Sequence, residues 1–151
     1  MLLLDVDGLK QINDTLGHLA GDRALIAIAD ALRGRLREGD VAARIGGDEY
    51  VVLLPHTDRR QAQQLADEIR RTIETQAIDV DAGMRQLGVS IGAAEINQRF
   101  HDIASALAEA DHAMYGEKRQ RVRGATTSAT RSAMTSGGIA STSTINDATD
   151  A

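Results

Sequence analysis

The chain has 151 residues, of which 42% are hydrophobic and only 2% aromatic, and its formal net charge is −5. These values predict one domain of ordinary size with a core of Leu, Ile, Val and Ala. The acidic balance argues against a nucleic-acid-binding protein, which normally carries a basic face. The absence of cysteine excludes a disulfide framework and suits a reducing cytoplasm. No apolar run approaches the roughly 20 residues of a membrane span, and the apolar start is too short for a signal peptide.

The first predicted element is a buried strand at residues 2–4 that ends in Asp5 and Asp7. A strand that delivers carboxylates at its C-terminal end is a common way to place hard oxygen ligands for Mg²⁺. The alternative is a strand-end carboxylate that caps a backbone turn. A polar loop and helix follow the strand, and Asp22 is expected to open the next helix.

Apolar residues at helical spacing predict three longer helices. They cover residues 21–37, residues 59–75 with Asp58 as N-cap, and residues 103–118. The apolar positions that define them are Leu25, Ile28, Leu32 and Leu36, then Ala62, Leu65, Ala66, Ile69 and Ile73, and last Ile103, Leu107, Ala110 and Met114. A further strand is predicted at residues 87–91 and extends to residue 94.

Between the first two of these helices, two apolar stretches at residues 41–45 and 51–54 flank a pair of glycines and a pair of acids. This pattern predicts a strand, a two-residue glycine turn and a second strand. A Gly-Gly tip lets a bulky ligand approach the backbone because no Cβ stands in the way. Asp48 and Glu49 follow the glycines, so a metal and a phosphate can meet at the tip. The alternative is an acidic hairpin without a ligand.

The element order β-α-α-β-β-α-β-α is typical of an α+β, ferredoxin-like arrangement, a mostly antiparallel central sheet with helices on one face. The periodic patterns stop near residue 123. From residue 124 onward most residues are Gly, Ala, Ser or Thr, without apolar periodicity. Such a segment cannot bury enough surface to offset its ordering entropy, so residues 124–151 are predicted to form a disordered tail.

Three motifs occur in a fixed order along the chain. D-x-D-x-x-K-x-I-N-D-x-x-G-H-x-x-G-D occupies residues 5–22, A-R-x-G-G-D-E-Y residues 43–50, and A-D-x-A-M-Y-x-x-K residues 110–118. With these motifs the chain resembles the GGDEF domain of bacterial diguanylate cyclases over residues 1–123. The resemblance implies the palm-type fold of nucleotidyl cyclases and polymerases. In that family a helix with a signature near LTGLxNR precedes the first strand, and nothing matches it, so we expect a domain truncated before its first strand and lacking regulatory input.

The resemblance implies that two GTP molecules are condensed into cyclic di-GMP with release of pyrophosphate. The 3′-hydroxyl of one GTP attacks the α-phosphate of the other, which requires positioning and charge neutralisation by metal ions. By resemblance, Asp5, the backbone carbonyl of Val6 and Asp48 bind Mg²⁺ or Mn²⁺. Asp48 is also expected to help deprotonate the hydroxyl, and Glu49 to support the metal or that proton transfer.

By the same resemblance, Gly46 and Gly47 lie under the nucleotide, and Asn13 and Asp22 read its guanine. An amide and a carboxylate suit the acceptor and donors on the Watson–Crick edge of guanine, and adenine leaves the carboxylate unpaired. Asp22 has the alternative role of a plain helix N-cap, and the two roles can coexist. His18 matches a family position near the base or the dimer interface, and a structural role in the turn is an equal expectation.

Lys10 and Lys118 are candidates for binding the triphosphate. Lys118 matches the lysine of the family's Y-x-A-K, although Glu117 replaces the alanine. The family continues with an arginine that also touches phosphate. That arginine is missing at its usual position, and substitution by Arg121 or Arg123 is an open question. The alternative for this basic cluster is a solvated helix end that complements the helix dipole.

Arg37 and Asp40 fit the family's R-x-x-D, which in relatives forms an inhibitory site for the product. The guanidinium and the carboxylate each grip a guanine or a phosphate. The alternative is a helix C-terminal arginine, a C-cap at Gly39 and a turn aspartate. A further arginine, which the following helix often contributes in relatives, has no match at Glu68, although residues 70–71 are both arginine.

These observations favour a diguanylate cyclase that consumes GTP. We expect it to work as a homodimer, because each domain binds one GTP, and to be inhibited by its product, cyclic di-GMP. One alternative is an inactive GGDEF module that only binds GTP or cyclic di-GMP, and the intact Asp5, Asp48 and Glu49 argue against it. Another is an adenylyl or guanylyl cyclase of related fold, which the glycine-acid hairpin disfavours. A cytoplasmic chain without nucleic-acid partner or membrane segment is expected. The input signal and the membrane attachment of any longer parent protein are open.

Overall fold

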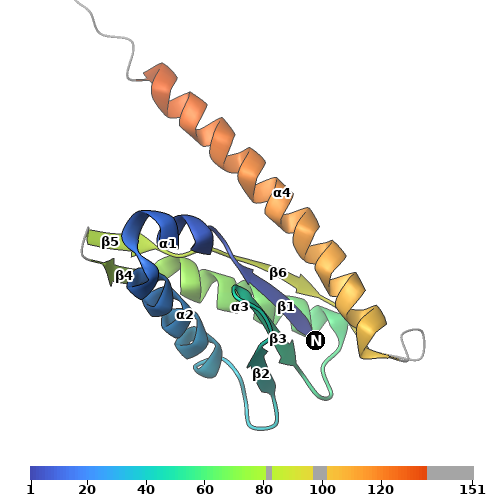
Figure 1. Ribbon diagram of the computed structural model, residues 1–151. Helices are drawn as coiled ribbons and strands as arrows, with labels where there is room; N and C mark the ends of the chain where they lie inside the picture. The colour runs from blue at the N-terminus through green and yellow to red at the C-terminus, as the bar shows by residue number, and fades with distance from the viewer. Residues whose placement is uncertain (81–82, 97–101, 136–151) are drawn as a thin grey trace, which may run out of the picture. The chain divides into compact units, whose positions relative to one another are not determined.

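Figure 1 shows the computed structural model of the chain, which describes residues 1–80, 83–96 and 102–135. Two compact units divide the chain, one covering Met1–Lys118 and the other beginning at Arg119. The first unit contains every residue assigned to the predicted catalytic, substrate, metal and product sites. Among the helices of the described residues, none is both long and apolar enough to cross a membrane.

A four-stranded sheet with the order β2-β3-β1-β6 forms the centre of the first unit (Figure 1). Its strands are β1 (Leu2–Val6), β2 (Val41–Arg44), β3 (Glu49–Leu53) and β6 (Val89–Ala93). All three pairings are antiparallel. The central strand β1 is buried throughout. Its register places Asp5 opposite Glu49 on β3 and opposite Ser90 on β6.

Four helices accompany the sheet in the part of the chain that the structure describes. They are α1 (Leu9–Leu16), α2 (His18–Arg33), α3 (Arg59–Thr75) and α4 (Ile103–Thr135). The predicted bounds of α3 are confirmed, and so is its N-cap. Asp58 Oδ1 accepts a hydrogen bond from the backbone N of Gln61 at 2.7 Å, and Gln61 Oε1 accepts one from the backbone N of Asp58 at 3.0 Å. This capping box satisfies two backbone donors at the start of the helix.

Successive residues of β1 face two different cores. Leu2, Leu4 and Val6 belong to the larger core, which α1, α2 and α3 complete. Met1 and Leu3 belong to a smaller core with the first turns of α4. Helices therefore cover both faces of the sheet, and the prediction of helices on one face is wrong. The consecutive leucines of β1 give the physical reason, because a strand buried on both sides needs apolar residues at successive positions.

The second helix starts and ends earlier than the expected range of residues 21–37. Gly17, with a φ of 85°, ends α1 and directly precedes α2, a backbone conformation that favours glycine. Asp22 consequently lies inside α2 and not at its N-cap, so the capping alternative is wrong. Because α2 ends at Arg33, both Arg37 and Asp40 lie in the loop that leads to β2.

A small hairpin of β4 (Ala77–Val80) and β5 (Gly83–Gln86) forms a separate antiparallel sheet that the sequence patterns do not predict. All residues of β5 are exposed, so no alternation of apolar and polar side chains marks this strand. The predicted strand at residues 87–94 is β6, which is shorter at both ends.

The last helix, α4, continues beyond its predicted end near Lys118 and reaches Thr135. It includes residues 124–135, where the composition predicts disorder. The side chains from residue 120 onward and the whole of residues 136–151 lie outside the described residues. Disorder of the tail therefore stays a prediction, and so does a phosphate contact by Arg121 or Arg123.

Candidate active site

The carboxylate of Asp5 lies near the C-terminal end of β1 and contacts α4. Lys118 Nζ donates a hydrogen bond to Asp5 Oδ1 at 2.6 Å, across 113 positions of sequence. Met114 packs in the smaller core, and Lys118 follows it by one helical turn, so both lie on the same face of α4. Only 13% of the Asp5 side chain is exposed. A carboxylate in this position requires a cation or hydrogen-bond donors nearby, and Lys118 supplies both.

Three carboxylates act electrostatically on the Lys118 ammonium, and that of Asp5 is in direct contact with it. Burial by itself would lower the pKa of Lys118, but the hydrogen bond to Asp5 and the negative charges of Asp5, Asp7 and Asp48 raise it above its usual value. These charges come from β1, from the loop after it and from the turn before β3. The end of the central strand is therefore a concentrated acidic site that binds positive charge.

The three predicted metal-binding residues come together at this acidic site. The backbone N of Val6 donates to the backbone O of Asp48 at 2.9 Å, which holds the turn before β3 against the end of β1. Carboxylates and carbonyl oxygens are the hard donors that Mg²⁺ and Mn²⁺ prefer, so the residues fit a divalent metal. Within the described residues, no group of three or more His, Cys, Asp or Glu side chains is arranged to hold a metal ion.

Asp7 and Ser90 belong to the same site. Asp7 is one of the two strand-end carboxylates that the sequence predicts as candidate Mg²⁺ ligands, whereas no role is predicted for Ser90. Ser90 Oγ donates to Asp7 Oδ1 at 2.8 Å, and the backbone N of Asp7 donates to the backbone O of Gly88 at 3.0 Å. Ser90 is completely buried. Asp7 follows Asp5 by two residues, and this spacing places both side chains on one side of an extended chain, so the sequence itself indicates that they share a site. Nothing in the sequence marks Ser90, since its role depends on the pairing of β6 with β1.

The connection between β2 and β3 is longer than the predicted two-residue turn. β2 ends at Arg44 and β3 begins at Glu49, so residues 45–48 form the turn. Neither glycine of this turn has a positive φ, which the primed two-residue turns require. A Cβ at Gly46 would lie 2.8 Å from Glu49 Oε2, whereas one at Gly47 would meet nothing within 4 Å. Gly46 thus makes room for the Glu49 side chain, and Gly47 leaves an open surface.

A cleft of about 440 Å³ lies next to the acidic site. This volume falls within the approximate 300–1,000 Å³ of small-molecule sites. The cleft brings together most of the predicted substrate-binding residues. Its lining comprises Leu9, Lys10, Asn13, Asp14, His18, Gly21, Asp22, Leu25, Arg44, Gly47 and Asp48. Gly46 and Lys118 are not part of this lining, and Lys118 instead contacts Asp5 at the acidic site. Arg44, which was not predicted, lines the cleft and donates from Nε to the backbone O of Gly46 at 3.0 Å.

The amide of Asn13 occupies space that only a glycine at position 21 leaves free. A Cβ built at Gly21 would overlap Asn13 Oδ1 and lie 2.9 Å from Asn13 Cγ. Asn13 is on α1 and Asp22 is the neighbour of Gly21 on α2, so this close approach holds the two predicted guanine-reading side chains in one cleft. Gly21 is therefore a site residue whose role the sequence alone did not reveal.

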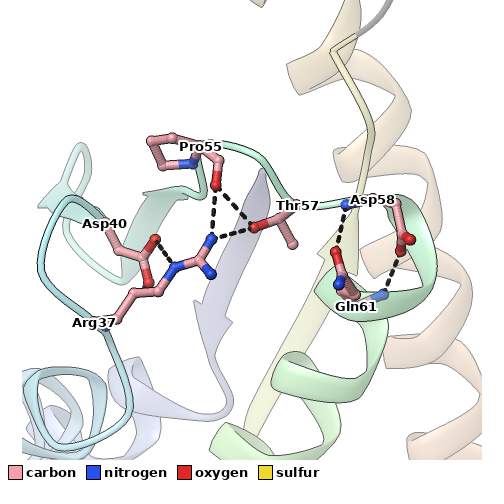
Figure 2. Close-up of polar contacts among 6 residues, drawn as sticks. All are labelled: Arg37, Asp40, Pro55, Thr57, Asp58 and Gln61. Atoms are coloured by element: carbon pink, nitrogen blue, oxygen red, sulfur yellow. Dashed lines mark hydrogen bonds and ion pairs between the residues drawn. The ribbon is translucent and has the colours of Figure 1, made fainter.

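The predicted product-binding pair, Arg37 and Asp40, is engaged within the chain (Figure 2). Arg37 Nε donates to Asp40 Oδ1 at 3.3 Å, and its terminal NH2 donates to the backbone O of Pro55 at 2.7 Å and to Thr57 Oγ1 at 2.9 Å. The Asp40 side chain is 3% exposed, whereas that of Arg37 is 61% exposed. Arg37 thus ties the loop before β2 to the loop before α3. The alternative of an arginine on the end of a helix is wrong, although Gly39 does adopt a positive φ of 96°.

Comparison with known proteins decides the family. The family described as "Diguanylate cyclase, GGDEF domain" matches residues 1–123. The chain belongs to the GGDEF family. It is 36% identical to diguanylate cyclase A of Treponema denticola over 119 residues, which are 79% of the chain and 32% of that protein. It is 41% identical to the crystal structure of the GGDEF domain of TpbB (YfiN) from Pseudomonas aeruginosa, with a TM-score of 0.71 over 79% of the chain and 74% of that structure.

A second solved relative is the GGDEF domain of DgcB from Caulobacter crescentus in complex with c-di-GMP. It is 27% identical, with a TM-score of 0.71 over 79% of this chain and 71% of that one. These likenesses confirm the α+β fold of nucleotidyl cyclases, with its antiparallel sheet flanked by helices. The chain spans between about a tenth and about a third of the length of the curated relatives it matches. GGDEF diguanylate cyclases are metal-dependent enzymes, which agrees with the acidic site of this GGDEF domain.

Proposed function

We propose that this GGDEF domain condenses two GTP molecules into cyclic di-GMP and releases pyrophosphate. The observation that carries the proposal is the position of Asp48. It lines the cleft that contains Asn13 and Asp22, and its charge also acts on Lys118 beside Asp5. One end of the cleft therefore suits a guanine, and the other suits metal-bound phosphates. The names of the relatives point to the same reaction.

Asp5, the carbonyl of Val6 and Asp48 would hold a divalent metal ion, for which Mg²⁺ is our proposal and Mn²⁺ the substitute. When bound, this ion neutralises charge on the reacting phosphates. Lys118 is close enough to the same carboxylates to transfer its hydrogen bond from Asp5 to a phosphate oxygen. Lys10 lines the cleft and adds a second positive charge. Phosphoryl transfer of this kind is chiefly positioning and charge neutralisation, and these residues provide both.

The attacking 3′-hydroxyl must lose its proton, and the carboxylates of Asp48 and Glu49 are the acceptors we propose. Glu49 lies directly opposite Asp5 in the sheet, with its carboxylate against Gly46. Asn13 and Asp22 are proposed to read the guanine, since an amide and a carboxylate complement its acceptor and donors. His18 lines the same cleft and is proposed to contact the base or the facing domain.

Each product molecule needs two bound GTP molecules, so we propose that two copies of the domain meet face to face as a homodimer. Cyclic di-GMP is proposed to inhibit at Arg37 and Asp40. The complex of the DgcB domain with c-di-GMP supports product binding by such a domain. The exposed guanidinium of Arg37 can reach an anionic ligand, provided that it gives up its contacts with Pro55 and Thr57.

The test is incubation of the purified chain with GTP and Mg²⁺, followed by chromatography of the nucleotides. We expect cyclic di-GMP and pyrophosphate in a ratio of one to two, no product in excess chelator, and little product from ATP. A cyclic mononucleotide or another mononucleotide as the product, in place of cyclic di-GMP, would indicate a different reaction. Binding of GTP without any product would indicate an inactive binding module.

A further inference from the structure

An ion pair between α3 and α4 lies directly beside Lys118. Arg70 on α3 donates from NH2 to Glu117 Oε2 at 2.8 Å, and its Nε lies 2.7 Å from Glu117 Oε1 without the alignment of a hydrogen bond. Its NH1 donates to Asp67 Oδ1 at 2.6 Å. The Arg70 and Glu117 side chains are only 17% and 22% exposed. One charge-assisted hydrogen bond and a second close contact between the same two groups hold α3 and α4 together at this point.

The Arg70–Glu117 pair lies at the point on α4 where the apolar contacts with the sheet end. Apolar residues recur every four positions on α4 and pack against the sheet, where the helix backbone lies against Gly92. They are Ala106, Ala110 and Met114. Among the described side chains of α4, Met114 is the last one in that apolar core. Lys118 falls one turn later on the same face, and Glu117 precedes it. Within the first unit, the Arg70–Glu117 pair is thus a polar attachment for the turn that carries Lys118.

We infer that Arg70 and Glu117 are positioning residues, which hold this turn of α4 so that Lys118 reaches Asp5 and the substrate phosphates. A lysine side chain is long and flexible, so the place that its ammonium group reaches depends on where the backbone is held. The role toward phosphate rests on the proposed function, whereas the placement of Lys118 over Asp5 does not. The competing explanation is an ordinary ion pair that contributes only to stability.

The first experiment measures the placement of Lys118 without any catalysis. The chain has only two lysines, Lys10 and Lys118, so an amine-acetylating reagent followed by mass spectrometry reports both separately. In chelator-treated full chain, we expect Glu117→Ala and Arg70→Gln to speed acetylation of Lys118 several-fold relative to Lys10. Arg71→Gln, the neighbouring exposed arginine on α3, is the matched control and should leave the ratio unchanged. An unchanged ratio in Glu117→Ala would overturn the inference.

The second experiment uses the rate of cyclic di-GMP formation. Glu117→Ala should raise the KM for GTP by roughly 3–10-fold, with kcat within about two-fold, because a contact made equally in the ground and transition states is weakened. In the Lys118→Ala background, Glu117→Ala should have no further effect on KM, since the pair acts through Lys118. A KM effect that persists there would show that the pair only supports the fold, and would overturn the inference.

The two experiments separate this inference from the proposed function. If the wild type makes no cyclic di-GMP, the proposed function fails, and acetylation of Lys118 still decides whether the pair positions it. Arg70→Gln leaves Asp67 and Glu117 without their guanidinium partner and can unfold the domain. Glu117→Ala introduces a strong helix former into α4 and leaves Arg70 its hydrogen bond to Asp67, so it keeps the test decisive, and thermal unfolding confirms that the variant is folded.

Discussion

Gly92 on β6 and Ala110 on α4 approach each other so closely that a Cβ at position 92 would overlap the Ala110 carbonyl oxygen. The same Cβ would lie 2.7 Å from the backbone N of Met114. Since these are backbone atoms, no side-chain rotation relieves the overlap, and the helix itself must move. The packing of α4 against the sheet therefore depends on the absence of a side chain at residue 92. The position of Lys118 depends on it as well.

We expect Gly92→Ala to lower the free energy of unfolding by at least about 2 kcal/mol, because the added methyl group overpacks the interface. Urea denaturation measures this. The matched control is Gly116→Ala on α4, where an added Cβ meets nothing within 4 Å. It should raise the stability by about 0.4–1 kcal/mol, as expected for glycine to alanine in a helix. Equal stability of Gly92→Ala and wild type would contradict the close packing of α4 against Gly92.

Replacement of Asp48 by alanine should abolish cyclic di-GMP formation in a protein that stays folded. Asp48 is the residue that joins the cleft to the acidic site, and metal-mediated charge neutralisation is worth several kcal/mol in such reactions. The control is Asp30→Ala, which removes an exposed carboxylate of α2 that pairs with Arg33. Retention of more than about a tenth of the wild-type rate by Asp48→Ala would remove Asp48 from the catalytic machinery.

Gly21→Ala should weaken GTP binding without weakening the fold. The new methyl group displaces the Asn13 amide, which is the movable end of a side chain, while alanine is favourable inside α2. Loss of one hydrogen-bonding partner for guanine predicts an affinity loss of about 1–2 kcal/mol in calorimetric titration. Combining Gly21→Ala with Asn13→Ala should produce no additional loss. Wild-type affinity in Gly21→Ala would show that Asn13 does not read the base from this position.

Arg37→Ala should let cyclic di-GMP formation continue while product accumulates, with an initial rate close to that of wild type. The same variant should lose about 1 kcal/mol of stability, because Arg37 also joins two loops through Pro55 and Thr57. Thr57→Val separates the two effects, since it removes one partner of Arg37 and keeps the guanidinium (Figure 2). It should cost similar stability but keep product inhibition. If the reaction rates of Arg37→Ala and wild type fall identically at matched product concentration, Arg37 only connects the two loops and does not bind product.

In the proposed homodimer two domains meet for each product molecule, so the specific activity should rise with protein concentration. A pair held together by a linker gains an effective concentration around millimolar, whereas free domains at micromolar concentration do not. Rates measured across a hundredfold dilution test this, and fusion to a leucine zipper should raise the activity at the dilute end. Constant specific activity over that range would be inconsistent with a weak active dimer.

Local patterns in the sequence determined much of this protein. The bounds of α3 follow from apolar spacing and from the side chain of Asp58, and both act within a few residues of the chain. The strand that ends in Asp5 and the residues Asn13, Asp22 and Asp48 were identified from motifs, and the structure brings them to one region. Such features depend on neighbours in sequence, so they can be inferred from it.

Tertiary structure alone decided the contacts between distant segments. The hydrogen bond from Lys118 to Asp5 depends on how α4 is seated over Gly92, and the role of Ser90 depends on the register of β6 with β1. The exposed strand β5 carries no apolar alternation, so only its pairing with β4 defines it. These contacts arise from strand register and from close approach of backbones. Both are properties of the packed chain, and no local stretch of sequence encodes them.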